Sequence, residues 1–211
     1  WIKELDINPM FASSSDIIAL DARVVLHLPG TPVEKLSKPS ICGYPHQYVS
    51  AFKTASGVEC AVRPIRPDDE TLMKQFEASL SEATVKAFMS EAVSLEERTS
   101  HKRMVPLCHA DFFRQIPLVA VAEGKIVGTM RMAKIPLTKN ARILVEVTDA
   151  FQKQGLGKYL LEQGLKIAQA EKVEKVSMKF FEDNAAMTKL AAACGFETAA
   201  KDGVVVATKT F

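Results

Sequence analysis

The chain of 211 residues has a formal net charge of +2 at pH 7, and 47% of its residues are hydrophobic, which is ordinary for a soluble globular protein. A charge so close to balance gives no reason to expect binding to nucleic acid or to an acidic membrane surface. The sequence also has no apolar run near the roughly 20 residues of a membrane-spanning helix. We therefore expect partners that are neither nucleic acid nor membrane.

Four cysteines are spread along the sequence without the CxxC or CxxH spacing of a zinc site: Cys42, Cys60, Cys108 and Cys194. Scattered thiols of this kind predict a reduced, cytoplasmic protein with no metal site in this part of the chain. The sequence begins at Trp1 rather than at a methionine, and we expect it to be a piece of a longer polypeptide.

The first 57 residues are predicted to hold a small β unit and a linker. Over residues 1–28, the apolar runs Ile17–Leu20 and Val24–Leu26 are typical of strands, and the serines at 13–15 indicate a turn between two strands. Residues 29–57 contain repeated proline and glycine without helical or strand periodicity. This stretch predicts an irregular linker and a domain boundary.

Residues 58–211 are predicted to form one α/β domain. The expected order is strand, two helices, three strands, helix, strand, helix, strand. This order favours a mixed central β-sheet flanked by helices. The strands are expected over 59–63, 117–122, 125–132, 141–147, 176–180 and 203–208; the helices are expected through Leu72, Phe76 and Leu80, through Val85, Phe88 and Met89, after Gly157, and over 185–194.

The stretch 152–157, which reads QKQGLG, lies between a predicted strand and an amphipathic helix. Backbone N–H groups at the start of a helix have no partner within it, and the helix dipole adds about half a positive charge there. Glycines let a phosphate approach this backbone closely, and Lys153 and Lys158 could add positive charge. A Walker loop is absent, and a dinucleotide loop would need a third glycine where Leu160 stands. A plain turn into the helix is the alternative.

This loop resembles the [QR]-x-x-G-x-[GA] loop of the GNAT acyltransferase superfamily, which cradles the pyrophosphate of coenzyme A. The elements after it also match that superfamily: a helix, a strand, Asn184, a short helix and Gly195-Phe196. Asn184 also suits a helix cap and Met187 a core position. The resemblance implies a GNAT fold, acetyl-CoA as cosubstrate, and these cofactor-binding residues: Val145, Val147, Gln152, Lys153, Gln154, Gly155, Leu156, Gly157, Lys158, Asn184 and Met187.

Further segments resemble Pat-type protein lysine acetyltransferases, and residues 1–28 resemble the last strands of the ATP-grasp subdomain in ADP-forming acyl-CoA synthetases. The resemblance implies a protein substrate, such as an acyl-CoA synthetase, and the rest of a synthetase-like chain as partner. In a whole ATP-grasp domain Glu4 and Asn8 would hold Mg²⁺, but a plain hairpin role is favoured for both. The Pat-like segments are RPIRPDDE from Arg63, CHADFFRQIPLVAV from Cys108 and DNAAMTKLA from Asp183.

Acetyl transfer to lysine needs a base, because only a few in ~10⁴ free lysine amines are neutral at pH 7. It also needs a donor for the oxyanion, and a backbone N–H near Val145 or Val147 is the candidate. Where the family has its glutamate base, this chain has Arg142. Glu146 shares that face of the strand about 13 Å further on, at roughly 3.3 Å per residue. It is the candidate catalytic residue, and a salt-bridged strand glutamate is the alternative.

Arg142 also suggests a second function, an acetyl-CoA-binding regulatory module with weak or no catalysis. A small-molecule amine acetyltransferase is a third reading that fits the same domain. Many family members have a tyrosine acid where Ala191 stands here, and His101 and His109 have no neighbour in the sequence that would orient them as bases. The sequence identifies neither the acceptor nor the oligomeric state.

Overall fold

The computed structural model describes residues 1–36, 42–88 and 93–211. They divide into two compact units, Trp1–Ser40 and Ile41–Phe211, which are described separately. The predicted helix residue Met89 and part of the predicted linker lie outside the described residues.

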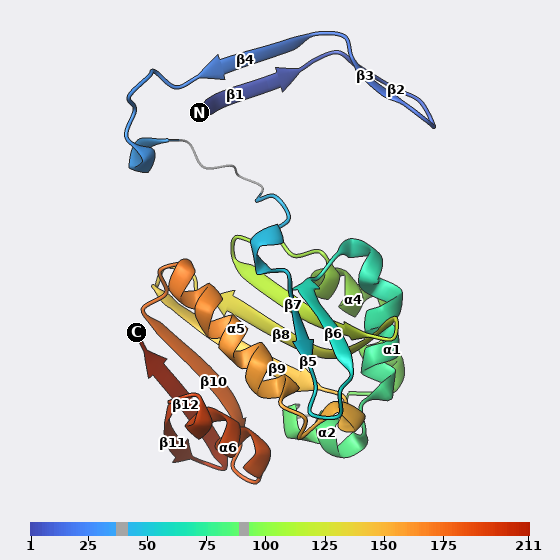
Figure 1. The fold of residues 1–211 in the computed structure, drawn as a ribbon, viewed down its shortest axis with the longest axis vertical. Helices are drawn as coiled ribbons and strands as arrows, with labels where there is room; N and C mark the ends of the chain where they lie inside the picture. The colour runs from blue at the N-terminus through green and yellow to red at the C-terminus, as the bar shows by residue number, and fades with distance from the viewer. Residues whose placement is uncertain (37–41, 89–92) are drawn as a thin grey trace. The chain divides into compact units, whose positions relative to one another are not determined.

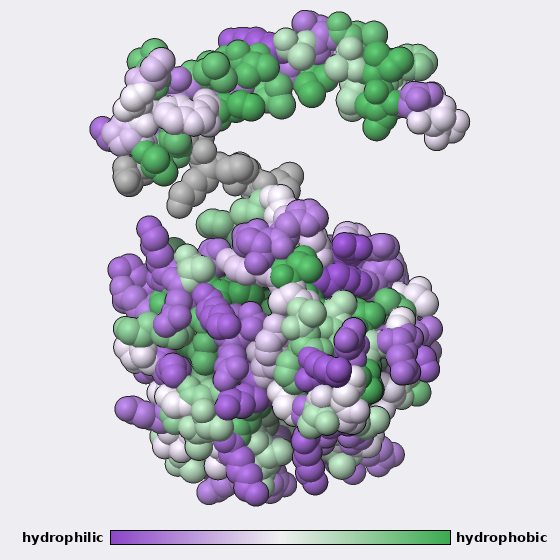
Figure 2. Space-filling model, in the orientation of Figure 1, coloured by the Kyte–Doolittle hydropathy of each residue, from purple (hydrophilic) through white to green (hydrophobic). Residues whose placement is uncertain are grey.

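The N-terminal unit is a β-ribbon. Where two strands were predicted, each is divided in two, so that β1 (Ile2–Ile7) pairs with β4 (Ala22–Leu26) and β2 (Met10–Ala12) pairs with β3 (Ile17–Ala19), both antiparallel. Ser13 forms the turn, because its Oγ accepts the backbone N–H of Asp16. Figure 2 shows apolar side chains along this unit; the exposed ones include Ile2, Leu5, Phe11, Ile17, Ile18 and Val24.

The second unit contains one eight-stranded sheet in the order β11-β12-β10-β9-β8-β7-β6-β5 (Figure 1). All neighbouring strands run antiparallel except β9 and β10, which are parallel. The predicted mixed sheet flanked by helices is therefore confirmed. The strands are β5 (Ser50–Lys53), β6 (Glu59–Pro64), β7 (Gln115–Ala122), β8 (Lys125–Lys134), β9 (Asn140–Val147), β10 (Lys175–Phe181), β11 (Glu197–Lys201) and β12 (Val204–Thr210).

The helices cover both faces of the sheet. Alternate residues of β7 enter two cores: Leu118 lies in the one that contains the buried face of α5, and Val119 in the one formed with α1 and α4. The helices are α1 (Glu70–Ser79), α2 (Glu82–Phe88), α3 (Leu95–Arg98), α4 (His101–Cys108), α5 (Leu156–Ala170) and α6 (Ala185–Ala193). Short 3-10 turns span Val33–Lys35, His46–Tyr48, Pro67–Asp69 and Asp149–Phe151.

Close packing of α5 on the sheet depends on Gly164. A Cβ at this position would lie 2.9 Å from Met130 Sδ and 3.1 Å from Ile143 Cδ1, so a side chain would push the helix away from β8 and β9. Because α5 lies this close, its first turn is held directly beside the end of β9.

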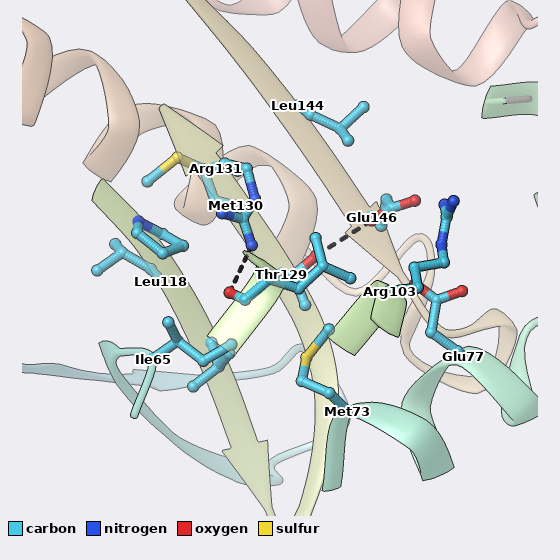
Figure 3. Close-up of a pocket in the computed structure, with 13 residues that line it drawn as sticks. Ile65, Met73, Glu77, Arg103, Leu118, Thr129, Met130, Arg131, Leu144 and Glu146 are labelled. Atoms are coloured by element: carbon cyan, nitrogen blue, oxygen red, sulfur yellow. Dashed lines mark hydrogen bonds between the residues drawn. The ribbon is translucent and has the colours of Figure 1, made fainter. Parts of the chain in front are cut away.

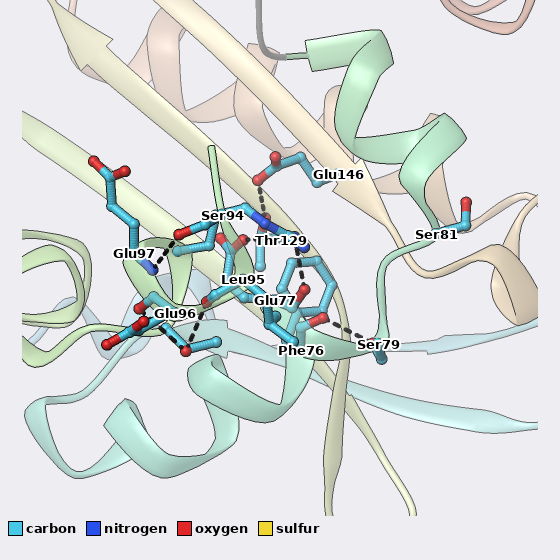
Figure 4. Close-up of polar contacts among 12 residues, drawn as sticks. Phe76, Glu77, Ser79, Ser81, Ser94, Leu95, Glu96, Glu97, Thr129 and Glu146 are labelled. Atoms are coloured by element: carbon cyan, nitrogen blue, oxygen red, sulfur yellow. Dashed lines mark hydrogen bonds and ion pairs between the residues drawn. The ribbon is translucent and has the colours of Figure 1, made fainter. Parts of the chain in front are cut away.

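Three expectations were wrong. Residues 29–57 were expected to lack regular structure, but they contain β5 and two 3-10 turns. β5 has four residues, too few to show a period, and it is a strand because it pairs with β6. α3 and α4 were not predicted, although a serine caps each of them. Ser94 accepts the N–H of Glu97 at the start of α3 (Figure 4), and Ser100 accepts the N–H of Arg103 at the start of α4. The missed strand β11 is fully exposed, so its sequence shows no apolar alternation.

Candidate functional site

A cleft of about 830 Å³ opens where β9 and β10 separate. Pairing between these strands reaches only from Asn140 to Arg142 on β9, and beyond that point the strands diverge. We call this space the main cleft. Its lining comes from α2, the end of β9, the start of α5 and α6: Ala83, Thr84, Ala87, Val145, Val147, Asp149, Gln152, Lys153, Gly155, Gly157, Lys158, Asn184, Ala185, Ala186, Met187, Lys189 and Leu190.

The N-terminus of α5 forms one wall of the main cleft. Gly155 is its N-cap residue, with φ +87°, a left-handed conformation that favours glycine. Among the residues that the structure describes, no side chain caps this helix, so its first N–H groups can meet a ligand. Lys153 and Lys158 line the same wall and add positive charge. This wall can therefore bind an anion such as a pyrophosphate.

Two of the predicted cofactor residues have side chains outside the lining of the main cleft. The side chain of Gln154 donates to the carbonyl of Ala150 at 2.6 Å and accepts from Ser56 Oγ at 2.5 Å. Leu156 is completely buried in the core. Each could meet a ligand only through its backbone. The other predicted cofactor residues line the cleft: Val145, Val147, Gln152, Lys153, Gly155, Gly157, Lys158, Asn184 and Met187.

A hydrogen-bond network holds α2 against the loop. Gln152 Nε2 donates to Thr84 Oγ1 and to the carbonyl of Val147, both at 3.2 Å. Asp149 accepts from the Oγ of Ser81 at 2.7 Å and from Thr84 Oγ1 at 2.9 Å. The bonds from Ser81 are the main reason that the pKa of Asp149 lies below its usual range. Sequence patterns did not reveal that α2 would line the cleft, because this contact joins segments that are 65 residues apart or more.

The backbone of β9 presents N–H groups to the main cleft. At its two ends, the carbonyl of Asn140 and the N–H of Thr148 bond toward the β8 side. Alternate residues of a strand turn their backbone groups to opposite sides. The N–H groups of Val145 and Val147 therefore face the gap left by β10, where the oxyanion donor was expected.

Glu146 faces a second space, a cavity of about 190 Å³ on the other side of β9 (Figure 3). We call it the small cavity. Most of its walls are apolar, and its polar groups come from Glu77, Arg103, Thr129, Arg131 and Glu146. The apolar lining is Ile65, Met73, Leu107, Pro117, Leu118, Val119, Met130 and Leu144.

Glu146 is half-buried, and Thr129 Oγ1 donates to its Oε2 at 3.4 Å. Burial raises the pKa of this carboxyl to about 7, with a further contribution from the negative charge of Glu77. The Thr129 hydrogen bond and the positive charges of Arg131 and Arg103 act in the opposite direction. A carboxyl with this pKa can both release and accept a proton near neutral pH.

Other candidates lie away from these spaces. Arg142, in the place of the family's glutamate, has an exposed side chain. His101 is exposed and pairs with Glu70 Oε1 at 2.8 Å, and His109 is also exposed. Ala191 is completely buried, so it offers no group to a ligand.

The four cysteines are free thiols, and burial raises the pKa of Cys60, Cys108 and Cys194. Across residues 1–36, 42–88 and 93–211, no three His, Cys, Asp or Glu side chains are grouped to hold a metal ion. Within the same ranges, every helix is too short or too polar to cross a membrane.

Comparison with known proteins places this geometry in a family. Residues 81–196 match the family model described as acetyltransferase (GNAT) family. The GNAT domain of PAT from S. lividans superposes with a TM-score of 0.73 at 23% identity, and the match covers 80% of this chain and all of that domain.

Two further solved structures are similar. RimJ from Mycobacterium smegmatis, in complex with CoA-disulfide, has a TM-score of 0.64 and 16% identity, covering 77% of this chain and 86% of its own. The PaiA N-acetyltransferase from Thermoplasma acidophilum, in complex with coenzyme A, has a TM-score of 0.61 and 13% identity. The match covers 72% of this chain and 99% of that protein's chain. At these identities the likeness shows the fold, so the expected fold is confirmed.

Proposed function

The chain belongs to the acetyltransferase (GNAT) family, and on that basis we propose that it transfers an acetyl group from acetyl-CoA to a lysine side chain of a protein. The observation that carries this proposal is the position of β9 between two spaces. Its backbone N–H groups face the main cleft, and its one carboxylate, Glu146, faces the small cavity.

Acetyl-CoA fits the main cleft. The N-terminus of α5, with Gly155 and Gly157, would bind the pyrophosphate, and Lys153 and Lys158 would add charge. The pantetheine arm would follow β9 where β10 leaves it. The N–H of Val145 would then stabilise negative charge on the thioester oxygen during the reaction.

The acceptor amine fits the small cavity, whose apolar walls suit the alkyl stem of a lysine. Glu146 would accept a proton from the amine while the amine nitrogen bonds to the thioester carbon. The C–S bond then breaks, and coenzyme A leaves as a thiolate that takes a proton from solvent. Because Ala191 is buried, no side chain at that position can act as the acid.

A protein substrate is supported by the similarity to the GNAT domain of PAT, and an acyl-CoA synthetase is the acceptor to test first. For residues 1–28 we propose the end of an ATP-grasp region whose partner is the rest of a synthetase-like chain. The exposed apolar side chains of the ribbon support this, because such a surface normally meets a partner. In the proposed domain division, 29–57 links this segment to the acetyltransferase domain at 58–211, although β5 already belongs to the sheet.

The test is incubation of the folded protein with acetyl-CoA and a purified acyl-CoA synthetase, followed by peptide mass spectrometry. We expect acetylation of a specific lysine that depends on the enzyme. Binding of acetyl-CoA in a calorimeter without any transfer would favour the second candidate, a regulatory module, which Arg142 in the usual glutamate position suggests. Transfer to free polyamines but to no protein would indicate a small-molecule acetyltransferase.

A further inference from the structure

Glu77 and Glu146 line the same small cavity from different elements, α1 and β9 (Figures 3 and 4). Glu77 is 3% exposed, and its Oε2 has no hydrogen-bond partner among the described residues. Arg98 Nη1 lies 3.7 Å from this Oε2 and also donates to the Glu77 backbone carbonyl at 2.9 Å. A buried carboxylate left this way is costly, so it needs an explanation.

The other charged groups around the cavity come from α4 and β8. Arg131 is held by two hydrogen bonds, to Gln115 Oε1 at 2.6 Å and to the carbonyl of Leu107 at 2.8 Å. Arg103 lines the cavity with a buried Nε that has no hydrogen-bond partner within the described part of the chain. Figure 3 shows its side chain beside those of Glu77 and Glu146.

Two carboxylates in one largely apolar cavity do not ionise independently. The negative charge of one makes the other harder to ionise, and the effect is large where water cannot screen it. Burial raises the pKa of Glu77, whereas the positive charges of Arg103 and Arg98 favour its charged form. Arg98 lies within ion-pair distance of Glu77, and the negative charge of Glu77, once ionised, acts on Glu146.

We propose that Glu77 is a positioning residue of this acetyltransferase, whose charge makes Glu146 a stronger proton acceptor for the acceptor amine. This inference rests on the proposed function, in which Glu146 is the base. It assigns a role to a residue on α1 that acts through Glu146 rather than on the reacting atoms. The charged groups that act on Glu146 are then Glu77 from α1, Arg103 from α4 and Arg131 from β8.

The direct test is a titration of Glu146 that needs neither acetyl-CoA nor turnover. The ¹³C-carboxyl signal of Glu146, assigned by its loss in Glu146→Gln, is followed with pH in the wild type and in Glu77→Gln. We expect the midpoint to fall by about one pH unit in Glu77→Gln, because a like charge has been removed. In Glu77→Asp, which keeps the charge, it should stay closer to the wild-type value.

Glu70→Gln is the matched control. Glu70 lies on the same helix but pairs with Lys74 and His101 at the surface, so its loss should leave the Glu146 midpoint unchanged. If Glu77→Gln does not fold because Arg98 is left unpaired, the double variant Glu77→Gln/Arg98→Gln removes both charges and should show the same fall. An unchanged midpoint in either folded variant would overturn the proposal.

Kinetics separate this role from a structural one. In Glu77→Gln, the acid limb of kcat/KM should move by the same one unit toward lower pH, with the KM for acetyl-CoA unchanged. An equal loss at every pH, with the limb in place, would mean that Glu77 only supports the fold. A wild type that transfers no acetyl group would instead overturn the proposed function, and the titration would still report whether Glu77 acts on Glu146.

Discussion

Val145 and Glu146 are neighbours in β9, yet they line different spaces, Val145 the main cleft and Glu146 the small cavity. The alternation of side chains along a strand produces this arrangement. The backbone proposed to hold the thioester oxygen and the carboxylate proposed to take the proton thus belong to consecutive residues. A cosubstrate and an acceptor can approach the same point from opposite sides of the strand.

Substituting Glu146→Gln should remove the proposed base and keep the shape of the cavity. We expect kcat to fall roughly 10²–10³-fold, while the dissociation constant of acetyl-CoA stays unchanged. Steady-state kinetics and calorimetry measure the two effects. Glu174→Gln is a suitable control, since Glu174 is an exposed residue paired with Lys139. Full activity in Glu146→Gln would show that Glu146 is not the base.

Acetyl transfer should lose rate as the pH falls through about 7, because Glu146 then gains the proton that prevents it from acting as a base. The acceptor amine adds its own pH dependence. Comparison of kcat/KM profiles between the wild type and Glu146→Gln separates the two, since the variant should keep only the dependence of the amine. If the variant still loses kcat/KM as the pH falls through about 7, the group that titrates there is not Glu146.

The same carboxyl should make stability depend on pH. Its pKa in the folded protein is raised, so the protonated form stabilises the fold at low pH, and this contribution is lost as the pH rises from about 4.5 through 7. The uncharged Glu146→Gln should therefore gain about 2 kcal/mol in unfolding free energy relative to wild type between pH 5 and pH 8. Urea denaturation at both pH values measures the gain. If the difference in unfolding free energy between Glu146→Gln and wild type were the same at about pH 5 and at about pH 8, the pKa of Glu146 would not be raised by folding.

Substituting Gly155→Ala should weaken acetyl-CoA binding by about tenfold and cost about 1 kcal/mol of stability. The left-handed backbone strains any side chain, and a Cβ there would lie 3.3 Å from the ring of Phe52. Gly203→Ala is the matched control, because Gly203 also has a positive φ, of +77°, and apart from its chain neighbours no described residue has an atom within 4 Å of its Cβ position. It should lose similar stability without losing affinity, as calorimetry and thermal unfolding can show.

Asp149→Ala should loosen α2 from the loop. It removes the acceptor for Ser81 and Thr84, and we expect a loss of about 1–2 kcal/mol together with weaker acetyl-CoA binding. Hydrogen exchange of the amides of α2 should become faster. Unchanged exchange there would mean that other contacts hold this helix.

The strands β6 to β10 and β12 and the loop were predictable because their signals are local. Val176, Met178 and Phe180 alternate along one strand, and the two glycines of the loop stand directly before an amphipathic helix. The expectation that Asn184 caps the last helix was also correct, since its Oδ1 accepts the N–H of Met187 at 3.0 Å.

The small cavity was not predictable in the same way. Glu77, Arg103 and Glu146 come from α1, α4 and β9, and only the fold brings them together. In the sequence, each of these residues is indistinguishable from an ordinary charged residue on the surface of a helix or strand. The sequence therefore revealed Glu146, which lies near a motif, but not the residues that set its properties.

The early separation of β9 and β10 has a consequence for the lifetime of the protein. Backbone that is not hydrogen-bonded to a neighbouring strand opens locally more often, and the opened segment can be cleaved by proteases. A molecule filling that gap would bind only the native state, and so would shift the balance away from opening. Under the proposed function, the supply of acetyl-CoA would then govern how long each copy survives as well as how fast it works.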